Sequence, residues 1–328
     1  MHPPDAILER TRQFMTSRII LTAAQLDIFT LLEKQPDSAN SLFLQLGVDP
    51  RALTRLLDAL VAAEILDKKD GIYHNTGQST LLSANHPETV RPMVLHMAEV
   101  WDSWSHLTEV VEKGEKPDLV PMTEKDDQTL EAFIGAMHVA GRQMAADIAA
   151  DLDLSGYKKL LDIGGASGTY TIAFLNKAPG LSAIVFDLPR VLPMAESRMA
   201  ENQMADRVEL RAGDYNTDEM PAGCDLALLS AIIHQNSPEQ NRSLYTRIHQ
   251  ALEPGGAILI RDHIMDENRT NPPGGAMFAI NMLVNTRGGD TYTFSEVKSD
   301  LEQAGFTDVA LVREGKSMDC VVMAVKPS

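Results

Sequence analysis

Residues 160–168 read Leu-Leu-Asp-Ile-Gly-Gly-Ala-Ser-Gly, and this stretch decides the fold class of the 328-residue chain. Its apolar first half is typical of a buried β-strand, and its glycines permit a sharp turn from a strand into a helix. A helical pattern follows over Tyr170–Lys177. A strand, a glycine-rich turn and a helix in this order predict a nucleotide-type loop, although the spacing is not the Gly-x-Gly-x-x-Gly of dinucleotide-binding proteins.

Towards the C-terminus, apolar runs alternate with amphipathic helical patterns. This alternation predicts an α/β fold with a parallel sheet and right-handed crossovers. The last two runs are separated by Glu314-Gly315-Lys316, a hairpin-like spacing, so the sheet is expected to end in an antiparallel pair. The expected strands cover residues 159–163, 183–188, 208–211, 225–231, 257–261, 308–313 and 319–325.

Towards the N-terminus, the pattern changes to short helices and one hairpin. A short helix over residues 40–46 is followed by a second helix, for which Asp49 is a suitable N-cap and Pro50 a suitable first residue. The turn dipeptide Asp70-Gly71 then joins two short strands. Helix, tight turn, helix and hairpin together predict a winged helix-turn-helix within residues 1–90.

The charge of the chain argues against nucleic acid as a partner. The chain has 29 lysine and arginine residues against 46 aspartate and glutamate residues, which gives a net charge of −17. Within residues 1–90 the counts are 8 and 11, a net charge of −3. A module that follows a phosphate backbone is expected to be basic. We therefore expect the winged helix to serve in packing or dimerisation.

The composition excludes several other classes of protein. Hydrophobic residues make up 44% and charged residues 23%, as in ordinary globular proteins rather than disordered chains. Cys224 and Cys320 form no Cys-x-x-Cys pair, so we expect neither a disulfide framework nor a zinc site. The sequence shows no signal peptide and no apolar run of about 18 residues. We expect a cytoplasmic protein with no metal and no membrane contact.

Acidic side chains follow the next two predicted strands. Asp187 ends the strand after the glycine-rich turn, at the distance from Asp162 where an acid is expected to meet ribose hydroxyls, and Asp214 ends the strand after that. Because ligands of doubly wound sheets bind at the carboxyl ends of the strands, these residues predict one ligand site at that edge.

Five motifs in order then suggest a family: Asp-Ile-Gly-Gly-Ala-Ser-Gly (162–168), Val-Phe-Asp-Leu-Pro (185–189), Ala-Gly-Asp-Tyr (212–215), Ile-Ile-His-Gln (232–235) and Glu-Pro-Gly-Gly (253–256). Together they resemble S-adenosylmethionine-dependent methyltransferases of the caffeate/hydroxyindole O-methyltransferase family, in its bacterial natural-product branch. The resemblance covers nearly the whole chain. It implies a Rossmann-like fold with a mostly parallel seven-stranded sheet and an antiparallel C-terminal hairpin, preceded by a winged-helix domain that forms a homodimer.

The resemblance implies three parts and a set of cofactor-binding residues. The parts are a dimerisation domain (1–90), a helical connector lining the active site (91–150) and a catalytic domain (151–328). S-adenosylmethionine is the implied cofactor and S-adenosylhomocysteine its product. The implied contacts are Gly164 with the methionine part, Asp187 with ribose, Asp214 and Tyr215 beside adenine, and Ser230 nearby. We add Arg142 for the cofactor carboxylate, because no other arginine or lysine lies between residues 128 and 157.

The resemblance also implies the residues that act on the acceptor, a small aromatic or quinonoid molecule with a hydroxyl group. His234 matches the general base, and Asp262 falls where the family carries an acid beside that base. A histidine suits this step because it can take up a proton as the hydroxyl oxygen attacks the methyl group. Phe133 and Met137 match helix residues that line the methyl-transfer pocket, and Met282 resembles a substrate-facing methionine on a later helix.

Four departures from the family pattern leave alternatives open. Ala166 stands at a usual glycine, and Ser230 where plant members carry a lysine. Gln235-Asn236 replaces the plant Asp-Trp, and Thr291 stands at a second catalytic acid, with Asp290 adjacent. Methylation at carbon or nitrogen, or a drifted cofactor-binding protein, therefore stays possible within the fold. A winged-helix transcription regulator that senses S-adenosylmethionine is an alternative of another class, and an NAD-dependent dehydrogenase fits least.

Overall fold

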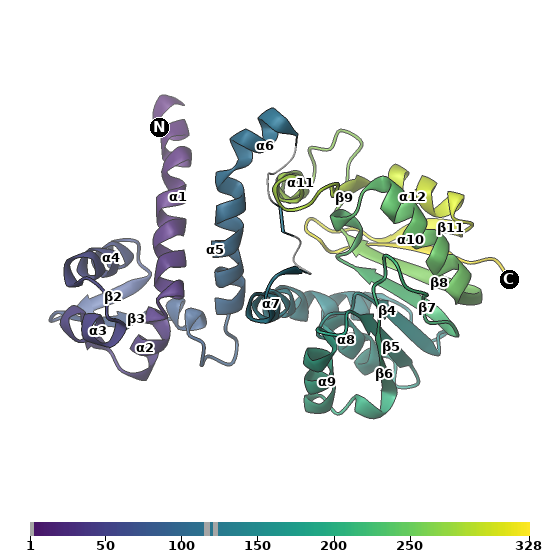
Figure 1. The fold of residues 1–328 in the computed structure, drawn as a ribbon, viewed down its shortest axis with the longest axis horizontal. Coiled ribbons are helices and arrows are strands. Elements are labelled where there is room, and N and C mark those ends of the chain that lie inside the picture. The colour runs from purple at the N-terminus through teal and green to yellow at the C-terminus, as the bar shows by residue number, and fades with distance from the viewer. Residues whose placement is uncertain (1–2, 115–118, 121–123) are drawn as a thin grey trace. The chain divides into compact units, whose positions relative to one another are not determined.

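The computed structural model describes residues 3–114, 119–120 and 124–328, which form two compact units. The first unit comprises the chain up to Asp102 together with Gly135–Val139, and the second comprises Ser103–Ile134 and Ala140–Ser328. Figure 1 labels the helices and strands of both units. Residues 115–118 and 121–123 of the predicted connector lie outside the described residues. The three-part division of the chain stays a prediction.

The helix-turn-helix predicted for the N-terminal part is present. Helix α3 (Ala39–Leu46) ends at Gly47, whose φ of 66° suits a residue without a Cβ atom. Helix α4 (Pro50–Ala62) begins after Asp49, whose side chain accepts a hydrogen bond from the backbone amide of Ala52. These capping residues define both sides of the turn between the two helices.

The predicted wing is an antiparallel pair of strands, β2 (Leu66–Lys69) and β3 (Ile72–Asn75). A short strand, β1 (Asp37–Ser38), pairs with the other edge of β3 and completes a three-stranded sheet. Apolar side chains from the helices and the wing form the core of this unit, among them Phe29, Leu32, Leu42, Leu57, Leu60 and Tyr73.

The chain begins with two helices, α1 (Pro3–Gln25) and α2 (Ile28–Lys34), separated at Asp27 by a φ of 57°. Among the described residues, no single helix is long and apolar enough to cross a membrane. Helices α1 and α2 meet that test of length and composition only as a pair bent by 61°. The helical segments that follow are η1 (Ser79–Leu82), α5 (Arg91–Ser105), α6 (Leu107–Lys113) and α7 (Asp127–Asp151).

A seven-stranded sheet in the order β11-β12-β8-β7-β4-β5-β6 forms the centre of the second unit (Figure 1). The strands from β8 to β6 are parallel, whereas β12 is antiparallel to both β8 and β11. This arrangement confirms the predicted sheet and its C-terminal hairpin. The strands are β4 (Lys159–Ile163), β5 (Ser182–Asp187), β6 (Val208–Ala212), β7 (Cys224–Ser230), β8 (Leu252–Asp262), β11 (Thr307–Arg313) and β12 (Cys320–Val325).

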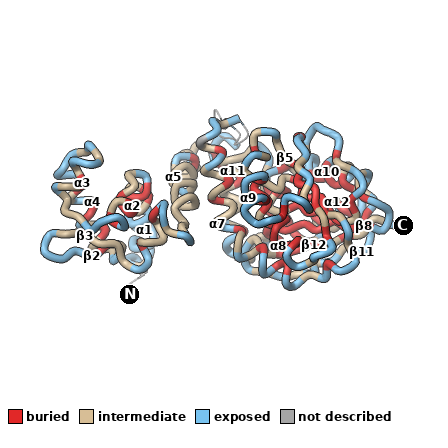
Figure 2. Tube along the Cα trace, turned by 90° about the horizontal axis from the view of Figure 1, so that it is seen from below, coloured by how far each residue is buried: buried red, intermediate tan, exposed pale blue. Residues whose placement is uncertain are grey.

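Helices cover both faces of this sheet. One face packs against α7, α8 (Thr169–Lys177) and α9 (Leu192–Glu201), and the other against α10 (Pro238–Ala251) and α12 (Phe294–Gln303). Successive side chains of a strand point to opposite faces, so the central parallel strands are apolar throughout. Figure 2 shows this as buried positions concentrated in the sheet.

Two features of the second unit differ from the prediction. Strand β8 begins at Leu252 rather than at residue 257. The Gly255 amide donates a hydrogen bond to the Lys326 carbonyl, and the Lys326 amide donates one to the Gly256 carbonyl, which continues the pairing into this segment. Two further strands, β9 (Ile264–Met265) and β10 (Tyr292–Thr293), form a separate parallel pair. Each has only two residues, which is too short for a periodicity to predict. Helix α11 (Pro273–Asn285) lies between them in the chain.

Candidate active site

The glycine-rich turn after β4 requires glycine for steric reasons. Gly164 and Gly168 adopt φ values of 66° and 74°, a region that favours glycine. A Cβ atom at Gly164 would lie 2.6 Å from the Cδ1 atom of Ile232. Ala166, at the usual glycine of the family, also has a positive φ of 50°. The backbone of this turn therefore lies directly against the segment that follows β7.

Asp187 ends β5 and holds the glycine-rich turn. Its Oδ2 atom accepts a hydrogen bond from the Ala166 amide at 2.8 Å, and its Oδ1 atom accepts one from the Leu188 amide at 2.7 Å. Burial raises the pKa of Asp187, and these two amides act in the opposite direction. Asp214, after β6, lies close enough to raise the pKa of Asp187 further. The two predicted acids therefore lie at one edge of the sheet.

Tyr215 completes the predicted nucleoside-binding set. Its Cε1 atom would lie 3.5 Å from a Cβ atom at Gly164, so the aromatic ring borders the glycine-rich turn. Burial, with the nearby charges of Asp187 and Asp214, raises the pKa of the Tyr215 phenol to about 12. The structure thus brings these four residues together at the carboxyl ends of β4, β5 and β6.

The turn after β7 lies beside the glycine-rich turn. Ser230 is the last residue of β7, and its hydroxyl is buried with no hydrogen-bond partner in the described part of the chain. Ala231 follows with a φ of 60°, and its amide donates a hydrogen bond to the Arg261 carbonyl at 2.9 Å. This turn carries Ile232 to Gly164 and leads directly into the predicted catalytic histidine.

His234 and Asp262 form a buried pair at the same edge of the sheet. His234 lies in the short helix η4 (Ile233–Gln235), and Asp262 ends β8. The His234 Nδ1 atom is 2.9 Å from both carboxylate oxygens, and the two residues are 6% and 1% exposed. Phe278 of α11 packs edge-on against the imidazole, with the ring centroids 4.9 Å apart. These contacts hold the imidazole in one orientation.

The structure places Asp262 beside His234 and places Asp290 elsewhere. Burial by itself would raise the pKa of Asp262, but His234, the charge of Arg261 and the amide of His263 hold that pKa below its ordinary value. Asp290 instead forms an ion pair with Arg269, whose Nη1 atom is 3.1 Å from its Oδ2 atom. The geometry therefore favours Asp262 over Asp290 as the acid that supports the base.

The predicted pocket residues lie on α7 and α11. Phe133 packs in a cluster with Ala166 and Leu188, next to the glycine-rich turn. Met282 is buried on α11. Met137 is half-buried on α7 and belongs to the first compact unit, so its contact with the acceptor stays a prediction.

Arg142, the residue predicted to bind the cofactor carboxylate, is half-buried on α7. The adjacent Gly141 lies against the ring of Tyr170, because a Cβ atom there would be 3.3 Å from its Cε2 atom. This places the segment that carries Arg142 near the start of α8. The contact between Arg142 and the cofactor stays a prediction.

Two residues beside the His234–Asp262 pair, the half-buried Phe278 and the buried His263, are missing from the sequence prediction. Phe278 packs against both His234 and His263, at centroid distances of 4.9 and 5.0 Å. His263 is 7% exposed, and burial lowers the pKa of its imidazole. Its position directly after Asp262 is a signal that could have identified it. No comparable signal marks Phe278, whose contacts span more than ten residues of sequence.

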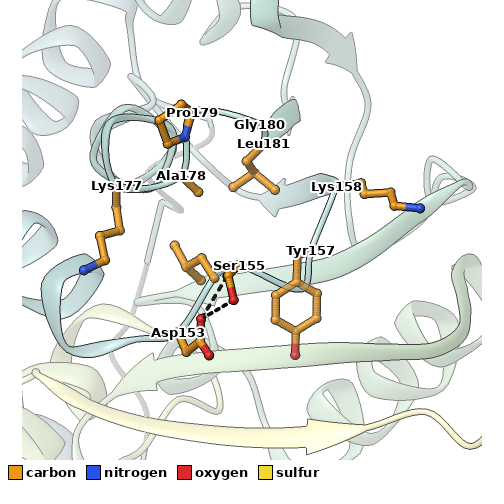
Figure 3. A pocket seen from close by; sticks show the side chains of 10 residues that line it. Asp153, Ser155, Tyr157, Lys158, Lys177, Ala178, Pro179, Gly180 and Leu181 are labelled. Carbon is orange, nitrogen blue, oxygen red and sulfur yellow. Dashed lines mark hydrogen bonds between the residues drawn. The ribbon is translucent and has the colours of Figure 1, made fainter.

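A cavity of about 430 Å³ lies at the opposite edge of the sheet, at the amino ends of β4 and β5 (Figure 3). Lys158 and Lys177 extend away from each other there, and Asp153 accepts two hydrogen bonds from Ser155. Ligands of doubly wound sheets bind at the carboxyl ends of the strands, so we do not place the active site in this cavity. In the described ranges, no three His, Cys, Asp or Glu side chains are grouped as a metal ion would require.

Known protein families match both parts of the chain. The O-methyltransferase domain family matches residues 104–307, and the O-methyltransferase dimerisation domain family matches residues 8–85. The match to the first of these families covers more than half of the chain.

Individual relatives agree with this result. The tetracenomycin polyketide synthesis 8-O-methyl transferase TcmO of Streptomyces glaucescens is 33% identical, over 93% of this chain and 92% of TcmO. Human N-acetylserotonin methyltransferase, solved in complex with SAM, has a TM-score of 0.88 and 24% identity, over 100% of this chain and 99% of its own. The N,N-8-amino-8-demethyl-D-riboflavin dimethyltransferase RosA from Streptomyces davawensis has a TM-score of 0.84 and 25% identity, over the whole of both chains. The chain therefore belongs to the O-methyltransferase family that its motifs resemble.

Proposed function

We propose that the chain transfers the methyl group of S-adenosylmethionine to a hydroxyl of a small aromatic or quinonoid metabolite. The observation that carries this proposal is the buried His234–Asp262 pair, with the Nδ1 atom 2.9 Å from both carboxylate oxygens. This pair lies at the same sheet edge as the glycine-rich turn and Asp187. A positioned base next to a nucleotide-type site is the arrangement that methyl transfer to a hydroxyl needs.

The residues at the sheet edge fit S-adenosylmethionine. Each carboxylate oxygen of Asp187 accepts one backbone amide and keeps capacity for a further hydrogen bond, as ribose hydroxyls require. Tyr215 and Asp214 border the space beside them, where they would flank adenine. A side chain at Gly164 would collide with Ile232, so the turn keeps its backbone open to the methionine part. When bound, the cofactor supplies a methyl group already activated on a sulfonium.

His234 acts as the general base in this proposal. With its Nδ1–H donated to Asp262, its Nε2 atom is left to accept the proton of the acceptor hydroxyl. A phenol has a pKa of about 10 and histidine of about 6.5, so the proton moves to Nε2 as the oxygen attacks, not beforehand. Asp262 orients the imidazole and stabilises the imidazolium that forms.

The class of acceptor follows from the pocket and from a relative. Phe133 packs beside the glycine-rich turn, and Met282, buried on α11, would add apolar surface, since methionine adapts to flat aromatic ligands. Met137, on the same helix as Phe133, would extend this surface. The name of TcmO describes an 8-O-methyl transferase of polyketide synthesis, which supports an aromatic hydroxyl as the acceptor.

Methylation of an aromatic amine is the second candidate function. It is favoured by RosA, which is described as an N,N-dimethyltransferase and shares the fold of this chain. The same histidine would take up the proton that the amine releases after methylation. The element that carries the new methyl group in the product distinguishes the two functions.

We also propose that the chain forms a homodimer through its N-terminal domain. The dimerisation family matches residues 8–85, and α1 exposes Ile7, Leu8, Phe14 and Met15, each by 46% or more. An exposed apolar face of this kind marks an interaction surface. We expect wild type to be a dimer by light scattering. Phe14→Asp should dissociate it, whereas Leu44→Asp, an exposed apolar position on α3, should not. A monomeric wild type would contradict the proposal.

Transfer of a radiolabelled methyl group tests the enzymatic proposal. The labelled S-adenosylmethionine is offered with hydroxynaphthoates, hydroxyindoles and hydroxyquinones, and with the corresponding amines, and the products are identified by mass spectrometry. We expect a product methylated on oxygen, and a loss of about 10²- to 10⁴-fold in kcat for His234→Ala. His74→Ala, on the wing strand β3, should match wild type. No transfer to any hydroxyl, or full activity of His234→Ala, would refute the proposal.

A further inference from the structure

Three buried polar atoms without a hydrogen-bond partner lie on the sheet face opposite the His234–Asp262 pair. They are the Nε atom of Arg261, the hydroxyl oxygen of Tyr170 and the Oγ atom of Ser230. Ser230 and Arg261 are register partners on β7 and β8, so their side chains point to the same face, towards α7 and α8. The guanidinium carbon of Arg261 is 5.0 Å from the centroid of the Tyr170 ring. The three groups therefore form one cluster.

Arg261 brings a positive charge into this cluster, and the nearest carboxylate that acts on it, Asp262, points to the other face of the sheet. The residue is 6% exposed, and in the described part of the chain no carboxylate lies within ion-pair distance of its guanidinium. Its Nη2 atom contacts the sulfur of Met144 at 2.9 Å. A buried charge without a partner is costly, and buried polar groups in native proteins are normally paired. An arginine without an ion pair, next to the hydroxyls of Tyr170 and Ser230, is the donor set that a carboxylate ligand requires.

The strand order identifies which carboxylate can reach this cluster. Asp214 and Asp187 follow β6 and β5, so the nucleoside part of the cofactor lies at that end of the sheet edge. The rest of the cofactor would then extend past β4 towards β7 and β8, where Ser230 is the last residue of β7 and Arg261 the second-last of β8. We propose that Arg261, with Tyr170 and Ser230, binds the methionyl carboxylate of the cofactor. This inference rests on the proposed function.

The arrangement gives Arg261 a positioning role. Asp262, the next residue of β8, points to the other face and holds His234. Neighbouring residues of one strand would thus hold the cofactor carboxylate on one face of the sheet and orient the base on the other. Arg142, predicted from the sequence for the same carboxylate, is the competing anchor.

Calorimetric titration with S-adenosylhomocysteine and with 5′-methylthioadenosine, which lacks the amino-acid part, tests this inference. Arg261→Met keeps the length of the side chain and removes its charge. We expect this variant to bind S-adenosylhomocysteine about 10- to 150-fold more weakly than wild type, the range for the loss of a hydrogen bond to a charged group. The affinity for 5′-methylthioadenosine should stay within about twofold of wild type, because a merely structural role would change both.

Two further variants complete the test. Tyr170→Phe removes only one hydroxyl. It should lower the affinity for S-adenosylhomocysteine by about two- to tenfold and leave the affinity for 5′-methylthioadenosine unchanged. This variant provides the readout if Arg261→Met does not fold. Arg142→Met should leave the preference between the two ligands unchanged. Wild type that binds neither ligand would refute the proposed function together with this inference. If wild type binds both ligands, two results would refute the inference alone. In the first, Arg261→Met and Tyr170→Phe show no selective loss of affinity for S-adenosylhomocysteine. In the second, Arg142→Met shows that selective loss.

Discussion

Replacing Asp262 by asparagine should disable His234 while leaving the shape of the site almost unchanged. In wild type, the carboxylate accepts the Nδ1 proton and leaves Nε2 free to take up a proton. The asparagine amide can present its NH₂ group to Nδ1, which then becomes an acceptor and forces the proton onto Nε2. The variant therefore places the imidazole in the tautomer that cannot act as a base towards the acceptor hydroxyl.

The size of the effect follows from the distance and the burial of the pair. An imidazolium and a carboxylate at 2.9 Å attract each other by about 6 kcal/mol at an effective dielectric constant of about 20. The attraction is the upper bound on the loss in Asp262→Asn. The lower bound is the net contribution of a hydrogen bond to a charged group, about 1.5–3 kcal/mol. At about 1.4 kcal/mol for each factor of ten, kcat should fall between about 10-fold and 10⁴-fold.

The assay is methyl transfer to whichever hydroxyl of the panel wild type methylates, with S-adenosylhomocysteine affinity measured alongside. That affinity should be unchanged in Asp262→Asn. The matched control is Asp290→Asn, whose carboxylate is 46% exposed and pairs with Arg269. We expect it to retain kcat within about twofold, because exposed ion pairs contribute little. Nitrogen chemical shifts of His234 report the tautomer directly, without an acceptor.

Two outcomes would refute the reasoning about the catalytic pair. In the first, Asp262→Asn retains wild-type kcat and the same His234 tautomer. In the second, Asp290→Asn causes the larger loss, which would make Asp290 the supporting acid.

Two further predictions concern the glycine-rich turn and the strand that leads into it. Gly164→Ala should lower the free energy of unfolding by about 1–2 kcal/mol, because Gly164 has a positive φ. It should also lower the affinity for S-adenosylhomocysteine. Gly180→Ala, which meets no atom within 4 Å, should do neither, and equal effects in calorimetry and chemical denaturation would contradict the prediction. Burial raises the pKa of Asp162 from 3.8 to about 6, so its contribution to stability is present below pH 4 and is lost as the pH rises to 6. The free energy of unfolding of Asp162→Asn, whose amide oxygen can still accept a hydrogen bond from Thr171, should therefore rise by about 2 kcal/mol relative to that of wild type between pH 4 and pH 7. A constant difference would contradict this.

The strands could be predicted because parallel strands are buried on both faces and read as apolar runs. The predicted bounds of β4 are those of the structure. The bounds of β5 and β7 differ by one residue at both ends, and those of β6 by one residue at the C-terminal end. The start of β8 could not be predicted, because it depends on the pairing of Gly255 and Gly256 with Lys326, far away in the chain. The β9–β10 pair likewise depends on contacts between distant segments.

The site could be predicted as far as strand order determines it. His234 and Asp262 follow adjacent strands, so their proximity is a consequence of the topology. The choice between Asp262 and Asp290 depends on Arg269, whose loop captures the second acid, and no local pattern shows this. Arg261 was not singled out, because a charged residue at the end of a strand normally faces solvent. Arg261 is buried because β8 pairs with β7 and because α7 and α8 cover this face of the sheet.

Calorimetric titration of wild type and Asp187→Ala with S-adenosylhomocysteine, S-adenosylmethionine and NAD tests the central claim most directly. The account predicts that the first two ligands bind wild type with one site per chain and that NAD does not bind. Asp187→Ala is expected to lose the binding of both ligands while still folding, because the proposal makes this carboxylate the acceptor of the ribose hydroxyls. Absence of binding to wild type, or equal affinity in the variant, would contradict the placement of the cofactor at the carboxyl ends of β4, β5 and β6.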